Sequence, residues 1–250
     1  GRLDAVNIVD PDLALITSID LDHQDWLGPD RERIGGEKAG ILRAGRPGVC
    51  GDCDPPESLL RRASELGAPL YCAERDFRWR RAPGGWQWEG PGSRRFGLPE
   101  PALRGDYQLA NGAAVLMVVE LLANRLPVSQ EAVRLGLQTA VLPGRFQVIP
   151  GDVTLVLDVA HNPQAANALA GNLRRLAPGG RVHAVFGLLG DKDLRGVLQP
   201  LTERVDSWHL PQRAGSRARP VADLAQELRA ILPGVEVTQY PAPRPALSGA

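Results

Sequence analysis

Short apolar segments alternate with longer amphipathic ones along the first part of the chain. Residues 14–19 form an apolar run that ends in polar residues, which is typical of a buried parallel strand. Residues 30–42 and 56–66 have helical spacing, and residues 49–51 and 69–72 are short strand candidates. Strand, helix and strand in this order predict a parallel α/β sheet.

The next segment alternates strictly and then turns. Residues 77–80 alternate apolar with basic positions, a Pro-Gly-Gly turn occupies residues 83–85, and residues 86–88 alternate again, which predicts a β-hairpin. Its arginines, interleaved with tryptophans, would suit a stacking platform for single-stranded nucleic acid. The alternative is a hairpin with one buried aromatic face and one solvated basic face. We favour this alternative because the chain is neutral overall.

The second half of the chain repeats the alternation of strands and helices. Helices are expected at residues 108–122 and 129–137, and Leu142-Pro143-Gly144 then breaks the pattern, so we place a domain boundary there. Beyond it we expect strands at residues 153–157, 182–186, 207–210 and 235–240, and helices at 163–176, 194–204 and 221–232. This order predicts a small Rossmann-like domain, but no Gly-x-Gly-x-x-Gly follows its first strand, so dinucleotide binding is not indicated.

Composition narrows the class of protein. The 250 residues are 43% hydrophobic, and 29 basic residues balance 29 acidic ones, which argues against a nucleic-acid partner. No apolar run is long enough to span a bilayer, so we expect a cytoplasmic protein with no membrane partner. Cys50 and Cys53 have C-x-x-C spacing, but no second pair or nearby histidine completes a zinc site. We therefore expect free thiols.

Several polar residues lie where an α/β sheet binds ligands. His23 follows the strand at residues 14–19, and it could hold a metal or only cap the following loop. Lys38 on the next helix could simply extend its ammonium group into solvent. Asp158 would end the strand at residues 153–157, where an unpaired buried carboxylate is costly, and Asn162 can cap the helix that begins next to it.

Four motifs are jointly specific, although none would be alone. They are Leu-Asp-His at residues 21–23, Glu-Lys-Ala-Gly-Ile at 37–41, Pro-Gly-Arg-Phe at 143–146 and Asp-Val-Ala-His-Asn-Pro at 158–163. With these motifs in the same order over nearly its whole length, the chain resembles the bifunctional dihydrofolate synthase/folylpolyglutamate synthase family. That family belongs to the Mur ligase superfamily of ATP-dependent amide-forming enzymes.

The resemblance implies an α/β fold in two parts. Residues 1–142 would be the C-terminal portion of a P-loop-type central ATP-binding domain with a β-hairpin. Residues 143–250 would be a smaller, truncated Rossmann-like domain, the glutamate-ligase domain.

The resemblance also implies roles for particular residues. His23 would bind magnesium, and Lys38 would be carbamylated by carbon dioxide, which requires an amine that has lost its proton. The segment Arg2, Leu3 and Asp4 would line the pterin-substrate site, with Val6 in place of the family's threonine. The nucleotide would be contacted by Asn111, Arg145 and Asp158. His161 would lie by the incoming glutamate, and Lys192 could attract a substrate carboxylate.

The implied reaction is the ATP-dependent addition of L-glutamate to dihydropteroate or to the γ-carboxylate of reduced folates, through an acyl phosphate. Its cofactors would be ATP and Mg²⁺, with K⁺ or another monovalent cation as an option, and the protein would be a monomer. Two other functions stay open: another Mur-type amide ligase that acts on a peptidoglycan peptide, and a non-catalytic binding module.

Two expected features are missing from the sequence. No Gly-Lys-Ser or Gly-Lys-Thr phosphate loop occurs in the 250 residues, and the family's metal-binding glutamate would lie just before Gly1. Because the chain also opens inside a motif, we expect it to be a piece of the enzyme. It would lack the N-terminal P-loop region and the extreme C-terminus, and would be inactive by itself.

Overall fold

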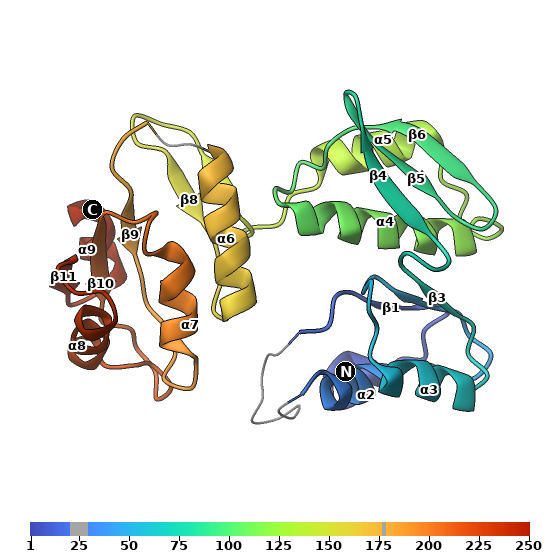
Figure 1. Cartoon of the computed structure of the whole chain (residues 1–250), viewed down its shortest axis with the longest axis horizontal. Helices are drawn as coiled ribbons and strands as arrows, with labels where there is room; N and C mark the ends of the chain where they lie inside the picture. Colours follow the sequence, from blue (N-terminus) through green and yellow to red (C-terminus); the bar gives the residue numbers. More distant parts are fainter. Residues whose placement is uncertain (21–29, 177–178) are drawn as a thin grey trace. The chain divides into compact units, whose positions relative to one another are not determined.

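The computed structural model describes residues 1–20, 30–176 and 179–250 (Figure 1). The chain divides into two compact units, Gly1–Leu142 and Pro143–Ala250, which we call the N-terminal unit and the C-terminal unit. Each is built from its own strands, helices and buried core, so each is described by itself. Within the described ranges, no helix is both long enough and apolar enough to cross a membrane.

The N-terminal unit begins with a parallel sheet of order β1-β2-β3. Its strands are β1 (Ala14–Ile16), β2 (Gly48–Cys50) and β3 (Leu70–Cys72), and a short 3₁₀ helix, η1 (Ala5–Ile8), precedes them. Helices α2 (Arg31–Ala39) and α3 (Glu57–Glu65) lie side by side on one face, where Ile16, Ile34 and Leu59 share a core (Figure 1). The predicted parallel α/β sheet is therefore confirmed.

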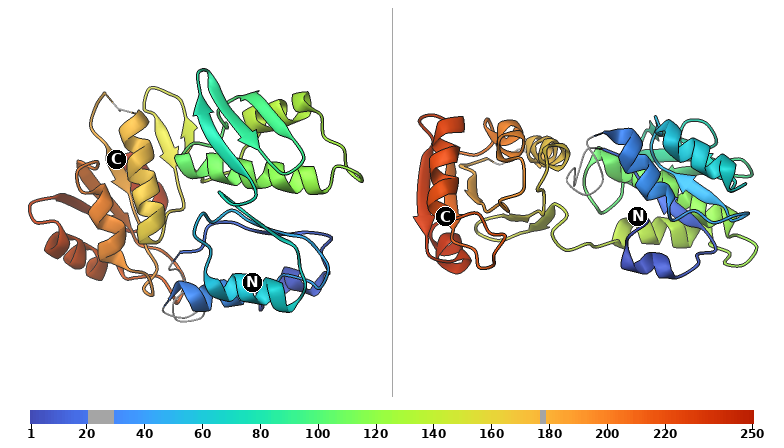
Figure 2. Two further views of the ribbon diagram at one scale, coloured as in Figure 1. Left: turned by 45° about the vertical axis from the view of Figure 1, so that its right-hand side comes forward. Right: turned by 90° about the horizontal axis from the view of Figure 1, so that it is seen from below.

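Helix α4 (Asp106–Leu121) lies between this sheet and a second, antiparallel one (Figure 2). Strand side chains alternate between faces, so Val49 of β2 points away from α2 and α3 and into the core around α4. That core also contains Trp86 and Trp88. A helix buried on two sides needs apolar residues all round, as the sequence of α4 has. Helix α5 (Gln130–Thr139) follows, with Ser129 as its N-cap, as predicted.

The predicted hairpin is part of a three-stranded meander. Its strands are β4 (Arg78–Ala82), β5 (Gly85–Glu89) and β6 (Arg94–Leu98), and each pairs antiparallel with the next. Trp86 and Trp88 are 0% and 1% exposed, so the sheet has a buried aromatic face, as the favoured alternative predicts. The third strand is not evident in the sequence because it carries a bulge opposite the Trp86–Trp88 step of β5, and the extra residue breaks the alternation of β6 itself.

The cysteines are free, as predicted. Cys50 and Cys72 are opposite each other on β2 and β3, and both are buried. The neighbouring Cys72 thiol and burial raise the pKa of Cys50. A protonated, inaccessible thiol is a packing group, so no redox function is needed to explain this pair.

The C-terminal unit contains a second parallel sheet, of order β11-β10-β9. Its strands are β9 (His183–Val185), β10 (Ser207–Pro211) and β11 (Glu236–Tyr240). The accompanying helices are α6 (Pro163–Leu176), α7 (Leu194–Leu198), α8 (Val221–Ile231) and α9 (Pro243–Gly249). Trp208 and Leu210 of β10 belong to one core with residues of α6, α7 and α8. The predicted alternation of strands and helices is confirmed here too.

Two details of the C-terminal unit differ from the prediction. The strand expected at residues 153–157 is β8 (Leu155–Leu157), which pairs antiparallel with β7 (Gln147–Ile149). Three residues are too few to show a period, so the sequence does not reveal β7. The helix expected at residues 194–204 ends at Leu198, and a 3₁₀ turn, η2 (Gln199–Leu201), follows because Pro200 has no backbone N–H to donate.

A partly buried hydrogen-bonded network joins the three strands of this sheet, with Ser207 and His209 at its buried centre. The Ser207 hydroxyl lies 2.8 Å from Nδ1 of His183 and 3.2 Å from Nε2 of His209. On its other side, Nδ1 of His209 lies 3.0 Å from the hydroxyl of Tyr240. Burial and the neighbouring His183 lower the pKa of His209, while Glu236 acts in the opposite direction.

The C-terminal unit should therefore lose stability on acidification. The pKa of His209 is lower in the folded state than the unfolded value of about 6.5, so the unfolded chain binds the proton first. Stability is complete above that value and falls as the pH falls below it. Urea unfolding followed at about pH 7.5 and about pH 5.5 measures the loss, which should be smaller for His209→Gln. An equal loss in the variant would contradict this assignment.

Candidate functional site

The first cluster of predicted site residues forms where the N-terminal segment lies against the end of α2. The backbone N–H of Arg2 donates to the carbonyl of Glu37 (2.9 Å), and the Arg2 guanidinium pairs with the Glu37 carboxylate (3.0 Å). The Asn7 amide donates to the carbonyls of Arg2 and Gly40 (3.1 and 3.2 Å). A Cβ atom at Gly40 would lie 2.6 Å from Cβ of Arg2, so only a glycine permits this approach.

This contact brings the Arg-Leu-Asp segment beside the helix that carries Lys38. Leu3 is 80% exposed, Asp4 is exposed, and Lys38 is half-buried in the last turn of α2. The Lys38 ammonium group has no hydrogen-bond or ion-pair partner among the residues that the structure describes. The juxtaposition of the two motifs follows from the fold, whereas the roles of their side chains stay predictions.

The predicted metal ligand His23 lies outside the described residues. In the described part of the chain, no group of three or more His, Cys, Asp or Glu side chains is arranged to hold a metal ion. The described side chains therefore do not make up a metal site by themselves.

A buried carboxylate at the opposite end of α2 was not evident from the sequence. Asp52, 8% exposed, accepts hydrogen bonds from the backbone N–H of Ile19 (2.7 Å) and from the Arg31 guanidinium (3.2 Å). Arg31 also donates to the carbonyl of Ile19 (3.0 Å). The pair thus ties the chain after β1 to the start of α2. An Asp in the Cys-Gly-Asp-Cys segment gives no sequence signal for such a role.

The second cluster forms in the C-terminal unit, where two motifs are joined through the main chain. The carboxylate of Asp158 accepts from the backbone N–H groups of Phe146 and Ala160 (both 2.8 Å), and the N–H of Val159 donates to the carbonyl of Gly144 (2.9 Å). Gly144 and Phe146 both have left-handed backbone, at φ 71° and 46°. This conformation is uncommon for phenylalanine, and the Asp158 bond together with burial of the ring (2% exposed) holds it.

The turn presents Arg145 and the imidazole of His161. Arg145 is exposed, between the two left-handed residues. Nδ1 of His161 lies 2.9 Å from the carbonyl of Val159, which can only accept. The proton of a neutral ring therefore lies on Nδ1, and the lone pair on Nε2. Asn162 accepts from the N–H of Ala165 (2.8 Å), which confirms it as the cap of α6.

The loops that follow the strands of this unit gather around the same turn. A Cβ atom at Gly196 would lie 2.6 Å from Pro163, so the N-termini of α6 and α7 are in contact. The Arg219 guanidinium donates to the carbonyls of Gly190 and Lys192 (3.1 and 3.2 Å). Parallel α/β sheets bind ligands at such a set of loops. Arg219, whose side chain is 12% exposed, was not evident from the sequence because nothing distinguishes it from the other arginines of its loop.

Asn111 lies in the first half of α4, in the N-terminal unit. Its side chain donates to the Gln108 amide oxygen (3.1 Å) and is half-buried. The structure therefore describes a helical polar pair here, and nucleotide contact by Asn111 stays a prediction.

Comparisons with known proteins show which enzymes this chain is similar to. Residues 144–250 match the family described as "Mur ligase, glutamate ligase domain". The dihydrofolate synthase/folylpolyglutamate synthase of Escherichia coli (strain K12) is 41% identical over 228 residues, which cover 91% of this chain and 53% of that protein. The protein of the same name from Haemophilus influenzae is 37% identical over 256 residues, with coverage of 95% and 57%. The chain thus spans about half the length of these relatives.

Solved structures agree. An E. coli structure described as "FolC in complex with DHPP and ADP" aligns with a TM-score of 0.89 and 38% identity, covering 100% of this chain and 57% of that one. A bifunctional folylpolyglutamate synthase/dihydrofolate synthase from Yersinia pestis, complexed with AMPPNP and Mn, aligns with a TM-score of 0.86 and 46% identity, with the same coverage. The chain is therefore similar to Mur ligases, and its residues 144–250 match the glutamate ligase domain of that family. Among the members of that family, it is similar to the dihydrofolate synthase/folylpolyglutamate synthases.

The main-chain contacts of Asp158 should stabilise the C-terminal unit. Asp158→Ala leaves two backbone N–H groups without their acceptor, and we expect a loss of about 1–3 kcal/mol in the free energy of unfolding. Urea unfolding of the 250-residue chain measures it. Asp152→Ala, which changes an exposed carboxylate in the same unit, is the control and should change stability by less than about 0.5 kcal/mol. Equal stability of the two variants would contradict the assignment.

Proposed function

We propose that this chain is part of an ATP-dependent ligase that joins L-glutamate to dihydropteroate or to the γ-carboxylate of a reduced folate. The observation that carries this proposal is the pairing of distant motifs. Arg2 meets Glu37 beside Lys38, and the turn of Arg145 meets the turn of Asp158 and His161. The names of the similar proteins support it, as do solved structures of relatives with nucleotide, Mn and L-glutamate bound.

The two units would divide the work. The N-terminal unit would be the C-terminal portion of a central ATP-binding domain, and its Arg2, Leu3 and Asp4 segment would line the pterin-substrate site. Leu3 supports this role because an apolar side chain left 80% exposed can pack against a ring system. The C-terminal unit would bind glutamate, in agreement with the family model that it matches.

The chemistry of making an amide in water sets the mechanism. A carboxylate is a poor electrophile, so its oxygen first attacks the γ-phosphorus of ATP, which forms an acyl phosphate and releases ADP. The amine of glutamate then attacks the acyl carbon, loses a proton, and phosphate leaves with the C–O bond electrons. Binding the nucleotide and stabilising the charge of the transferring phosphoryl group are the protein's main tasks.

Arg145 and His161 suit two of these tasks. Arg145 is a permanent planar cation on a turn of fixed backbone, and it would hold phosphate oxygens. His161, with its proton on Nδ1, offers the Nε2 lone pair to a proton of the attacking amine. Asp158 would act through the turn that it holds, with any nucleotide contact made by its remaining lone pairs.

The N-terminal residues would act on the phosphate side. At Lys38 the amine nitrogen would attack carbon dioxide and release one proton, which gives a carbamate. His23 would bind Mg²⁺, and Asn111 would contact the nucleotide. These three assignments rest on the resemblance of the motifs, and no step of the mechanism above depends on them.

In the full-length ligase, Arg145→Ala should raise KM for ATP about tenfold or more, because a charge-assisted contact to phosphate contributes about 1.5–3 kcal/mol. Arg145→Lys should recover only part of the loss, since lysine lacks the planar fork. Arg61→Gln, an exposed arginine on α3, is the control and should leave KM unchanged. Steady-state kinetics at varied ATP concentration measure the effect, and an unchanged KM in Arg145→Ala would contradict this role.

The 250 residues by themselves should not catalyse ligation. They contain no Gly-Lys-Ser or Gly-Lys-Thr loop to hold the triphosphate. Phosphate release in the presence of ATP, Mg²⁺, dihydropteroate and L-glutamate should equal that of a protein-free blank. Glutamate-dependent release above the blank would overturn this expectation.

A further inference from the structure

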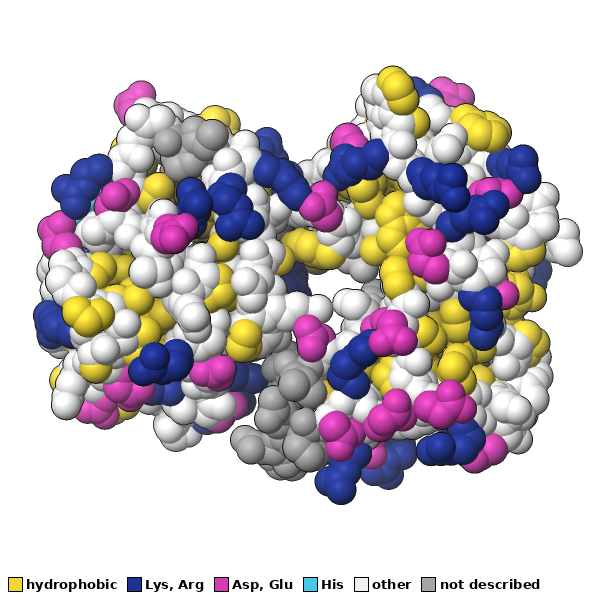
Figure 3. Space-filling model, viewed as in Figure 1, with side chains coloured by type: hydrophobic (Ala, Val, Ile, Leu, Met, Phe, Trp, Pro, Cys, Tyr) yellow, Lys and Arg dark blue, Asp and Glu magenta, His cyan; other side chains and the backbone are white. Residues whose placement is uncertain are grey.

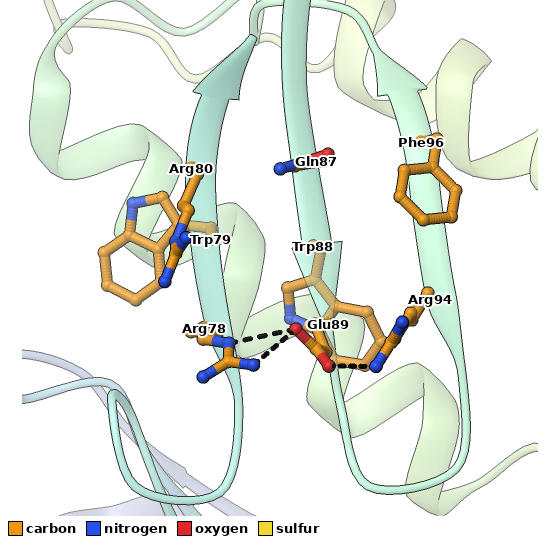
Figure 4. Close-up of a pocket in the computed structure, with 8 residues that line it drawn as sticks. All are labelled: Arg78, Trp79, Arg80, Gln87, Trp88, Glu89, Arg94 and Phe96. Carbon is orange, nitrogen blue, oxygen red and sulfur yellow. Dashed lines mark hydrogen bonds and ion pairs between the residues drawn. The ribbon is translucent and has the colours of Figure 1, made fainter.

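The outer face of the β4–β6 meander is not used by the function proposed above. Alternation along the strands sends Trp86 and Trp88 inward to α4, so their neighbours point outward. These outward residues surround a shallow hollow of about 190 Å³ (Figure 4). They are Arg78, Arg80, Gln87, Glu89, Arg94 and Phe96, and Trp79 and Trp88 complete the lining of the hollow. Basic side chains gather over this part of the molecule in the space-filling view (Figure 3).

Positive charges outnumber negative ones on this face. Glu89 lies between two arginines and pairs with Arg78 at 2.8 Å and with Arg94 at 2.7 Å (Figure 4). The hydrogen bond from Arg78, helped by the charge of Arg94, holds the pKa of the Glu89 carboxyl below its ordinary value. The Arg80 guanidinium has no hydrogen-bond or ion-pair partner in the described part of the chain. One carboxylate thus faces three guanidinium groups, and the face as a whole attracts anions.

An apolar group and an amide complete the face. Phe96 is 62% exposed, and Gln87 points outward on the neighbouring strand (Figure 4). The ring offers a surface for methylene groups, and the Gln87 amide can both donate to and accept from another amide. A ligand that matches all these groups carries carboxylates, methylenes and amides in one chain.

We propose that this face binds the oligo-γ-glutamate part of a folylpolyglutamate. For the identity of its ligand the proposal rests on the function proposed above. Each γ-linked residue supplies one carboxylate, two methylenes and one amide. Each γ-linked residue adds five atoms to the main chain, whereas an ordinary peptide residue adds three. When extended, these five atoms span roughly 6 Å. Arg78 and Arg80 lie two residues apart on one strand face, roughly 7 Å, so successive carboxylates meet successive guanidinium groups.

Single-stranded nucleic acid fits this face less well. Stacking platforms use several exposed aromatic rings in succession. Here Trp86 and Trp88 are buried and Trp79 is half-buried, so Phe96 is the one exposed ring that lines the hollow. The neighbouring arginine Arg81 is also engaged elsewhere, with Glu100 at 2.6 Å and Asp106 at 2.8 Å. A flexible polycarboxylate is therefore the occupant that the charges and the single ring favour.

Titration of the 250-residue chain with tetra-γ-L-glutamate tests the proposal. Isothermal calorimetry at about 50 mM salt should show saturable binding, which weakens as salt is added. Arg80→Gln should weaken binding about fivefold, the value of one exposed guanidinium–carboxylate contact. Arg81→Gln is the matched control: it removes the same group from the adjacent position, on the other face, and should leave the affinity unchanged. Both variants should keep the far-ultraviolet circular dichroism of the parent.

Several results would overturn the proposal. They are no saturable binding, equal affinity of Arg80→Gln and the parent chain, and equal loss in Arg81→Gln. Equal binding of α-linked tetraglutamate would assign the face to acidic peptides instead, and tighter binding of an oligouridylate would assign it to nucleic acid. The titration needs neither ATP nor ligation, so a negative result would leave the ligase function standing. An inactive full-length ligase would likewise leave a positive titration intact.

Discussion

The burial of α4 from two directions is the constraint on which the N-terminal unit depends. Its apolar side chains pack in one core with Val49 of the parallel sheet and with Trp86 and Trp88 of the meander. Removing both faces of one helix from water fixes the two sheets to each other. Because the inner face of the meander supplies this stabilisation, its outer face is free to carry charge. Stability and ligand binding are thus separated by the alternation of a β-strand.

Around both candidate sites, main-chain hydrogen bonds hold the segments that carry the site residues. In the N-terminal unit the backbone of Arg2 is bonded to Glu37, and in the C-terminal unit the backbone of Phe146 is bonded to Asp158. Side chains that must meet a substrate reproducibly are best held on backbone that cannot shift. The left-handed conformation of Phe146 shows that this rigidity has an energetic cost, which burial of its ring offsets.

Much of the fold could be predicted from the sequence. Period and composition revealed both parallel sheets, the helices around them and the caps at Ser129 and Asn162, because these depend on local preference. Strands β6 and β7 could not be found, since a bulge or a length of three residues hides the alternation. The role of Asp52 depends on Ile19 and Arg31, which are distant in the chain, so no local pattern encodes it. Motifs revealed which residues belong to the sites, whereas only the fold revealed which motifs touch.

Gly40 illustrates how such contacts restrict a sequence. Its backbone, at φ −61° and ψ −8°, is one that every amino acid adopts with ease, so conformation gives no reason for a glycine. The reason is the neighbouring Arg2, whose backbone occupies the volume that even one methyl group would need. Tolerance at this position is therefore set by a segment far away in the chain. A substitution there would release the N-terminal residues from the helix while leaving the helix itself intact.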